Sequence, residues 1–157
     1  MYTAAVLTVS DRCSQGRRSD EAGPLVASLL AGAGYRVIET AVVPDERPKI
    51  EAALAELSDQ KGAALVVTTG GTGFSPEDCT PEATTEILER PALGIPEAMR
   101  AHMLKASPLG VLTRATAGIR KKTLIVNLPG TPDIAQQCLA YILPFLKLGI
   151  QTMNETT

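Results

Sequence analysis

A β-branched apolar run that ends in three closely spaced glycines limits the fold of this chain more than any other feature. Ala64–Thr68 is typical of a buried strand, Gly70-Gly71-Thr72-Gly73 follows after Thr69, and Thr80-Pro81-Glu82 leads into a helical pattern. Glycines at a strand end let backbone N–H groups approach an anion without a Cβ in the way, and the next helix can add its positive N-terminus. The stretch therefore predicts a strand, an anion-binding loop and a helix in succession.

An acid, Asp78, follows this loop. An acid inside a phosphate cradle repels the ligand unless a cation lies between them, so the pattern indicates a glycine-rich anion loop with a candidate Mg²⁺ ligand. Two other interpretations remain open. A Gly-Gly-Thr-Gly run is a common way to turn out of a strand, and Ser75-Pro76-Glu77-Asp78 also fits a helix N-cap. The loop is not a Walker A motif, because no Gly-Lys-Ser/Thr follows it. Nor is it a dinucleotide fingerprint, because no glycine lies three residues after Gly73.

The remaining segments alternate between strand and helix patterns. Strands are expected at residues 3–9, 35–43, 64–68, 111–119 and 123–128, and helices at 22–33, 47–58, 81–89, 95–106 and 132–148. Strands that alternate with helices favour a largely parallel sheet covered on both faces. We therefore predict an α/β fold, a three-layer domain whose mostly parallel sheet carries helices on both faces, plus a short hairpin around Arg120-Lys121-Lys122.

Polar segments come directly after several predicted strands. They are Ser10-Asp11, Pro44-Asp45-Glu46, Gly70–Asp78 and Asn127–Thr131. In open α/β sheets ligands lie outside the carboxyl ends of the strands, so we expect several of these segments to form one site. By local sequence alone, Asp45 also fits a helix cap and Asp11 a turn.

Composition excludes several classes of protein. The net charge is −2, the basic residues are scattered and aromatic residues are few, which argues against nucleic-acid binding. Three widely spaced cysteines and the single His102 fit neither a zinc site nor a disulfide framework, and favour free thiols in a reducing cytoplasm. Neither a signal peptide nor a membrane-spanning run is present. We expect a cytoplasmic protein with one domain, residues 1–150, and a flexible tail at 151–157.

The chain resembles the molybdenum-cofactor biosynthesis (MoaB/MogA) family, which includes the gephyrin G domain. The signature run is Thr69-Gly70-Gly71-Thr72-Gly73, then Asp78, then Thr80-Pro81-Glu82-Ala83-Thr84. Supporting matches are Leu7–Asp11, Asp20 with Gly23-Pro24, Val43–Glu46, Leu112-Thr113-Arg114, Ala117–Arg120 and Thr123–Gly130. The resemblance covers residues 3–150, and its motifs look closer to MogA and gephyrin-type domains than to MoaB.

This resemblance implies a molybdopterin adenylyltransferase, which transfers AMP from Mg·ATP to the molybdopterin phosphate and releases pyrophosphate. It also implies that Asp45 and Asp78 are the aspartates that matter to activity, and we expect them to hold Mg²⁺ directly or through water. The expected nucleotide- and pterin-binding residues are Ser10, Asp11, Thr69, Gly70, Gly71, Thr72, Gly73, Arg114, Asn127, Pro129 and Gly130.

Further expectations follow from the resemblance. Family members are commonly trimeric, so a homotrimer is expected. The chain ends soon after its last predicted helix, so we expect a separate molybdate-inserting enzyme as a partner. The main alternative is a non-catalytic molybdopterin carrier or MoaB-like protein, which need not keep both aspartates. A competence-damage-type nucleotide hydrolase on the same fold is a weaker alternative.

Overall fold

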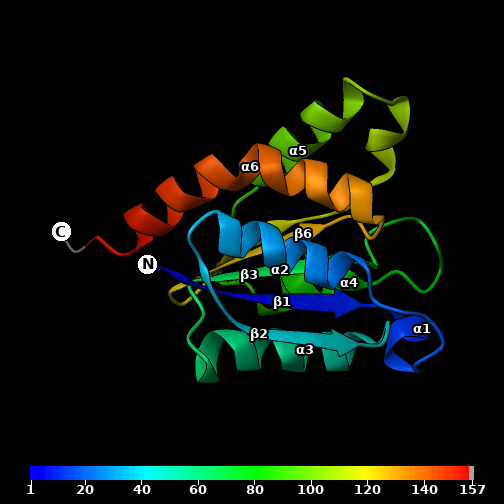
Figure 1. Cartoon of the computed structure of the whole chain (residues 1–157), viewed down its shortest axis with the longest axis horizontal. Coiled ribbons are helices and arrows are strands. Elements are labelled where there is room, and N and C mark those ends of the chain that lie inside the picture. Colours follow the sequence, from blue (N-terminus) through cyan, green and yellow to red (C-terminus); the bar gives the residue numbers. More distant parts are fainter. Residues whose placement is uncertain (156–157) are drawn as a thin grey trace.

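One mixed sheet forms the centre of the computed structural model, which describes residues 1–155 (Figure 1). Its strands are β1 (Thr3–Val9), β2 (Arg36–Val43), β3 (Leu65–Thr69), β4 (Arg90–Pro91), β5 (Ala117–Arg120) and β6 (Thr123–Leu128). They lie in the order β2-β1-β3-β6-β5-β4. The β2, β1, β3 and β6 strands are parallel, whereas β5 and β4 are antiparallel to their neighbours. The predicted mostly parallel sheet and the β5–β6 hairpin are therefore confirmed.

Helices cover both faces of this sheet. They are α1 (Asp11–Ser14), α2 (Ala22–Gly32), α3 (Arg47–Ala55), α4 (Thr80–Ile87), α5 (Gly94–Leu104) and α6 (Pro132–Met153), with a π-helical turn η1 (Glu56–Gln60) and a 3₁₀ turn η2 (Pro108–Leu112). The α2, α5 and α6 helices contribute to one hydrophobic cluster, and α3 and α4 to the other. The predicted three-layer arrangement follows from this division.

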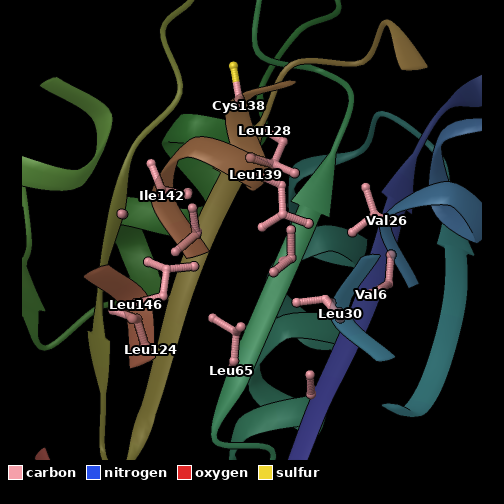
Figure 2. Close-up of a cluster of buried hydrophobic side chains, with 14 of the residues drawn as sticks. Val6, Val26, Leu30, Leu65, Leu124, Leu128, Cys138, Leu139, Ile142 and Leu146 are labelled. Carbon is pink, nitrogen blue, oxygen red and sulfur yellow. The ribbon is translucent and has the colours of Figure 1, made fainter. Parts of the chain in front are cut away.

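Alternation along the strands divides the core into these two clusters. Val6 and Val67 point to one face, whereas their neighbours Leu7 and Val66 point to the other, and all four side chains are buried. Figure 2 shows the first cluster, where side chains of α2 and α6 lie against the strands. On α6 the contacting residues recur at helical spacing, as Leu139, Ile142 and Leu146.

Several boundaries differ from the sequence-based predictions. The segment before β5 was expected to be a strand from Val111, but it begins as η2, because Pro108 starts the turn and the Ser107 hydroxyl accepts from the N–H of Leu109. The short β4 strand was not predicted, since two residues give no periodic signal. The polar loop after β1 contains the single turn α1, capped by the Ser10 hydroxyl, which accepts from the N–H of Cys13 at 3.2 Å.

The last helix is longer than predicted. It was expected to end near Leu148, but α6 continues to Met153, because Ile150 extends the buried stripe of Leu146 along the same helix face. The start of the expected flexible tail is therefore helical, and residues 156–157 lie outside the described part of the chain. Within residues 1–155, no helix combines the length and apolar character needed to cross a membrane.

The topology gathers the strand ends at one edge. Because β1 lies between β2 and β3, the chain passes to opposite sides of β1 after its first and second crossovers. Such a reversal of strand order opens a crevice at the carboxyl edge of an α/β sheet. The segments after β1, β2, β3 and β6 all begin at this edge.

Candidate functional site

A cleft of about 640 Å³ lies at this carboxyl edge. Residues from the ends of β1 and β3, and from the loop after β6, line it, together with the loop before α2. Most of the predicted site residues are brought together here, namely Ser10, Asp45, Thr69, Gly70, Gly71, Thr72, Gly73, Asp78, Pro129 and Gly130.

The carbonyl groups of the glycine loop, Gly70–Gly73, are all engaged by residues behind it. Thr80 accounts for the first two, since its hydroxyl donates to the Gly70 oxygen at 2.9 Å and its N–H donates to the Gly71 oxygen at 3.1 Å. Arg114 accounts for the others, since its N–H donates to the Thr72 oxygen at 2.8 Å and its Nε to the Gly73 oxygen at 2.7 Å. Every peptide carbonyl of the loop is thereby fixed.

The N–H groups on the same loop are mostly free. Among residues 1–155, the N–H groups of Gly71, Thr72 and Gly73 make no hydrogen bond to protein, whereas that of Gly70 donates to the Leu128 oxygen at 3.3 Å. Because these residues line the cleft, the free donors form a cradle for an anion.

Glycine is required at two positions of this loop. Gly70 and Gly71 have φ angles of 99° and 69°, in the left-handed region. A Cβ on Gly70 would overlap the Val9 oxygen, and a Cβ on Gly71 would overlap the Thr80 hydroxyl. Any larger residue would therefore displace the loop from β1 or from α4.

The loop after β6 lies directly against the glycine loop. The Thr69 hydroxyl donates to the Pro129 oxygen at 2.8 Å, and a Cβ on Gly130 would lie 3.1 Å from the Gly70 Cα atom. Glycine at positions 70 and 130 allows this close approach. The two predicted tight loops are thus in contact with each other, and both line the cleft.

Asp45 is held by a reciprocal pair of hydrogen bonds with Asp11. The Asp45 N–H donates to Asp11 Oδ1 at 2.8 Å, and the Asp11 N–H donates to Asp45 Oδ2 at 3.1 Å. Asp45 Oδ1 lies near the glycine loop, 3.0 Å from the position that a Gly71 Cβ would take. Burial raises the pKa of Asp45 above the usual aspartate value, and the charges of Asp11, Asp78 and Glu77 add to the rise.

Asp78 has both a local structural role and a place in the cleft. Its Oδ2 accepts from the Ser75 N–H at 3.1 Å, and its own N–H donates to the Ser75 oxygen at 3.0 Å. This is one half of the capping box expected from Ser75-Pro76-Glu77-Asp78, and it closes a turn and not a helix, since α4 starts at Thr80. Asp78 Oδ1 makes no hydrogen bond within the described residues, and the partly exposed side chain lines the cleft.

Three predicted site residues do not line the cleft. Asp11 turns to Asp45 instead. Asn127 is fully buried and bonds to three neighbours: its Nδ2 donates to the Thr68 and Thr84 hydroxyls, each at 3.0 Å, and its Oδ1 accepts from the Thr116 N–H at 3.1 Å.

Arg114 is the third of these residues. Its Nη1 pairs with Glu82 at 2.6 Å and its Nη2 donates to the Asp78 oxygen at 3.0 Å, in addition to the Nε bond to Gly73. Arg114 was expected to bind nucleotide or pterin, but its guanidinium lies behind the glycine loop, where Gly73, Asp78 and Glu82 take its donors.

Sequence reasoning missed other residues of the site. Asp20 lines the cleft, where its Oδ2 accepts from the buried Thr8 hydroxyl at 2.8 Å and its Oδ1 from the Gly23 N–H at 2.9 Å. The Asp20, Gly23-Pro24 spacing is a helix-start signal that could have placed it. Thr80 was expected at a helix start and in the signature run but not as a site residue, and its contact with the Gly70 oxygen gives no local signal.

The charges of the cleft fit a divalent cation next to an anion. Acidic side chains (Asp20, Glu21, Asp45, Glu77 and Asp78) outnumber the lone lining arginine, Arg18, while the loop offers N–H donors for an anion. Within residues 1–155 no group of three or more metal-binding side chains occurs. Asp45 and Asp78 are carboxylates of the kind that bind Mg²⁺, which usually takes one or two of them and completes its shell with water and substrate phosphates.

Comparisons with known proteins agree with this geometry. A family model described as "Probable molybdopterin binding domain" matches residues 5–148. A molybdopterin adenylyltransferase of Helicobacter pylori is 41% identical over 141 residues, which cover 88% of this chain and 80% of that protein. Gephyrin of Dictyostelium discoideum is 36% identical over 164 residues, which cover 98% of this chain and 23% of that protein.

The fold is also that of a solved relative. The crystal structure of the molybdopterin biosynthesis enzyme MoaB from Thermus thermophilus has a TM-score of 0.92 and 40% sequence identity to this chain. The match covers 98% of this chain and 96% of that one.

Proposed function

This chain belongs to the probable molybdopterin binding domain family, and we propose on that premise that it is a molybdopterin adenylyltransferase of molybdenum-cofactor biosynthesis. The observation that carries the proposal is the cradle of free N–H groups at Gly71–Gly73, which lies in one cleft with Asp45 and Asp78. Such a cleft suits a reaction between two phosphorylated molecules, because it combines donors for phosphate oxygens with ligands for a cation.

The reaction joins two anions. An oxygen of the terminal molybdopterin phosphate forms a bond to the α-phosphorus of ATP, the bond from that phosphorus to its β-side bridging oxygen breaks, and pyrophosphate leaves with the electron pair. Such transfers depend mainly on positioning and charge stabilisation. The glycine loop would supply fixed donors, and the cleft would hold the reacting groups in place.

Asp45 and Asp78 are the residues that would hold Mg²⁺, directly or through water. When bound, the ion would neutralise phosphate charge and draw the two substrates together. Burial is the main cause of the raised pKa of Asp45, and a bound cation would also relieve the repulsion that Asp11, Asp78 and Glu77 impose on its carboxylate. Asp11 orients Asp45 through the reciprocal hydrogen bonds.

The substrate pocket is proposed to combine the glycine loop with Ser10 and with Pro129-Gly130, all of which line the cleft. The adenylated pterin would pass to a separate molybdate-inserting enzyme. Acidic lining argues for small phosphorylated substrates that arrive with a cation, and against nucleic acid.

A homotrimer is proposed from the family resemblance, and the apolar surface of α5 and α6 would permit such an assembly. A groove of about 390 Å³ between these helices is lined by Ala92, Gly94, Ile95, Ala98, Ile142 and Phe145. Phe145 is 50% exposed and Leu148 is 64% exposed, so this face of α6 presents apolar side chains to solvent. Sedimentation equilibrium tests the assembly: the mass of three chains would support the proposal, and the mass of one or two chains would overturn it.

The direct test of the activity uses purified protein with molybdopterin and ATP, with Mg²⁺ or with chelator. Adenylated molybdopterin and pyrophosphate should form in equal amounts when Mg²⁺ is present. A non-catalytic carrier would bind molybdopterin and form neither product.

A further inference from the structure

We propose that Arg114 and Thr80 together form a positioning brace that turns the N–H groups of the glycine loop toward the cleft, and that Arg114 does not itself contact substrate. This inference rests on the proposed function, because it concerns the loop that is taken to bind phosphate. It replaces the expected nucleotide or pterin contact of Arg114 with a role behind the loop.

The peptide groups of the glycine loop share one orientation. A peptide plane carries its C=O and the following N–H on opposite edges. The carbonyls of Gly70, Gly71, Thr72 and Gly73 are all bonded to Thr80 or Arg114. The N–H groups of the residues that follow the first three carbonyls are therefore directed away from the brace, and these are the N–H groups that remain unpaired.

Arg114 also contacts the backbone of Asp78. Arg114 uses three separate side-chain nitrogens, on the oxygens of Gly73, Asp78 and Glu82. One planar guanidinium thereby ties the end of the glycine loop to the backbone of Asp78 and to α4. Lysine has a single terminal nitrogen and cannot reproduce this fork.

Thr80 and Arg114 are themselves held in place. Thr80 is fully buried at the start of α4, and the Arg114 N–H is itself bonded to the Thr72 oxygen. Neither residue lies among those that line the cleft. Both can therefore affect phosphate binding only through the loop, which distinguishes a brace from a ligand-contacting pair.

The experiment measures binding of pyrophosphate with Mg²⁺ by calorimetry, because pyrophosphate is the proposed product and needs no turnover. The variants are Arg114→Lys, Thr80→Val and Thr80→Ser. Arg47→Lys is the matched control, since Arg47 pairs with Glu51 and Glu86 on exposed surface and is not among the residues that line the cleft. Thermal unfolding of each variant identifies any that fail to fold.

The brace predicts that Arg114→Lys and Thr80→Val each weaken binding by about tenfold, as expected for the loss of one or two loop hydrogen bonds. Thr80→Ser, which keeps the hydroxyl, should bind as the wild type does, and so should Arg47→Lys. The double variant should lose less than the product of the single losses, because both residues act through the same loop.

The other outcomes separate the two proposals. If the wild type does not bind pyrophosphate, the proposed phosphate cradle itself is wrong. If the wild type binds and Thr80→Val also binds normally while Arg114→Lys does not, Arg114 contacts the ligand directly and the brace is overturned. If both variants bind normally, the brace is overturned while the cradle stands.

Discussion

Asp11 and Asp45 each accept a hydrogen bond from the other's backbone, at 2.8 Å to Asp11 Oδ1 and 3.1 Å to Asp45 Oδ2. The two bonds join the turn after β1 to the turn after β2 and fix the orientation of the Asp45 carboxylate. One oxygen is used in this pairing, and the other lies near Gly71. The link explains how an acid at the end of an edge strand is held in the cleft.

Removing the Asp11 side chain should therefore impair the reaction without removing the proposed metal ligand, Asp45. We expect Asp11→Ala to lower kcat by roughly 10–100-fold, the range typical for outer partners of metal ligands. Asp11→Asn keeps an oxygen that can accept from the Asp45 N–H and should lose much less. Steady-state kinetics at several Mg²⁺ concentrations check this, and equal losses in the two variants would contradict it.

The charged carboxylate of Asp45 should lower the stability of the folded protein at neutral pH. Its folded-state pKa is raised by burial and by nearby acids, so its contribution to stability is present below the usual aspartate pKa and is lost as pH rises through the raised value. At pH 7 without Mg²⁺, Asp45→Asn should unfold at the same temperature as the wild type or higher, and the difference should vanish in acid. A lower Tm for Asp45→Asn at pH 7 would show that the carboxylate is stabilising.

The charge of Glu77 contributes to that raised pKa. In Mg²⁺-free protein, Glu77→Gln should lower the pKa of Asp45 toward the usual aspartate value, because one repulsive charge is removed. Titration of the Asp45 carboxyl carbon by NMR measures this directly. Glu21→Gln serves as the matched control, since Glu21 lines the cleft but does not contribute to the shift. An unchanged value in Glu77→Gln would contradict the electrostatic account.

Asn127 should act on stability and not on substrate affinity. It is fully buried with three hydrogen bonds, so Asn127→Leu leaves buried polar groups unpaired, at a cost of about 1–3 kcal/mol for each group. Urea denaturation measures the loss. Asn154→Ala, at the exposed end of α6, should change stability very little. A raised KM for Asn127→Leu with normal stability would restore its expected role in the pocket.

The sequence allowed the strands, their parallel pairing and both tight loops to be predicted, because β-branched runs, glycines and helix caps are local signals. The short β4 strand and η2 carry weak signals. Val111 and Leu112 look like strand residues, yet they are exposed in η2, where the buried Gly110 would contact Met103 if it carried a Cβ. Tertiary contact overrode the local preference there.

The prediction of site residues shows the same limit. Position at a strand end placed Asp45 and Asp78 correctly in the cleft, because topology decides which strand ends meet. The direction of a side chain depends on partners far away in sequence. Arg114 meets Gly73 and Asp78, and Asn127 meets Thr68 and Thr84, so neither orientation could be read from its own segment.

The central claim is that Asp45 and Asp78 serve adenylyl transfer in this cleft. The most direct measurement follows adenylated molybdopterin and pyrophosphate formed from molybdopterin, ATP and Mg²⁺ by the wild type, Asp45→Ala and Asp78→Ala. We predict product from the wild type, its loss when Mg²⁺ is chelated, and a drop on the order of a hundredfold or more in each variant. Tight binding of molybdopterin by the wild type with no adenylated product would contradict the account and leave the cleft as a binding site only.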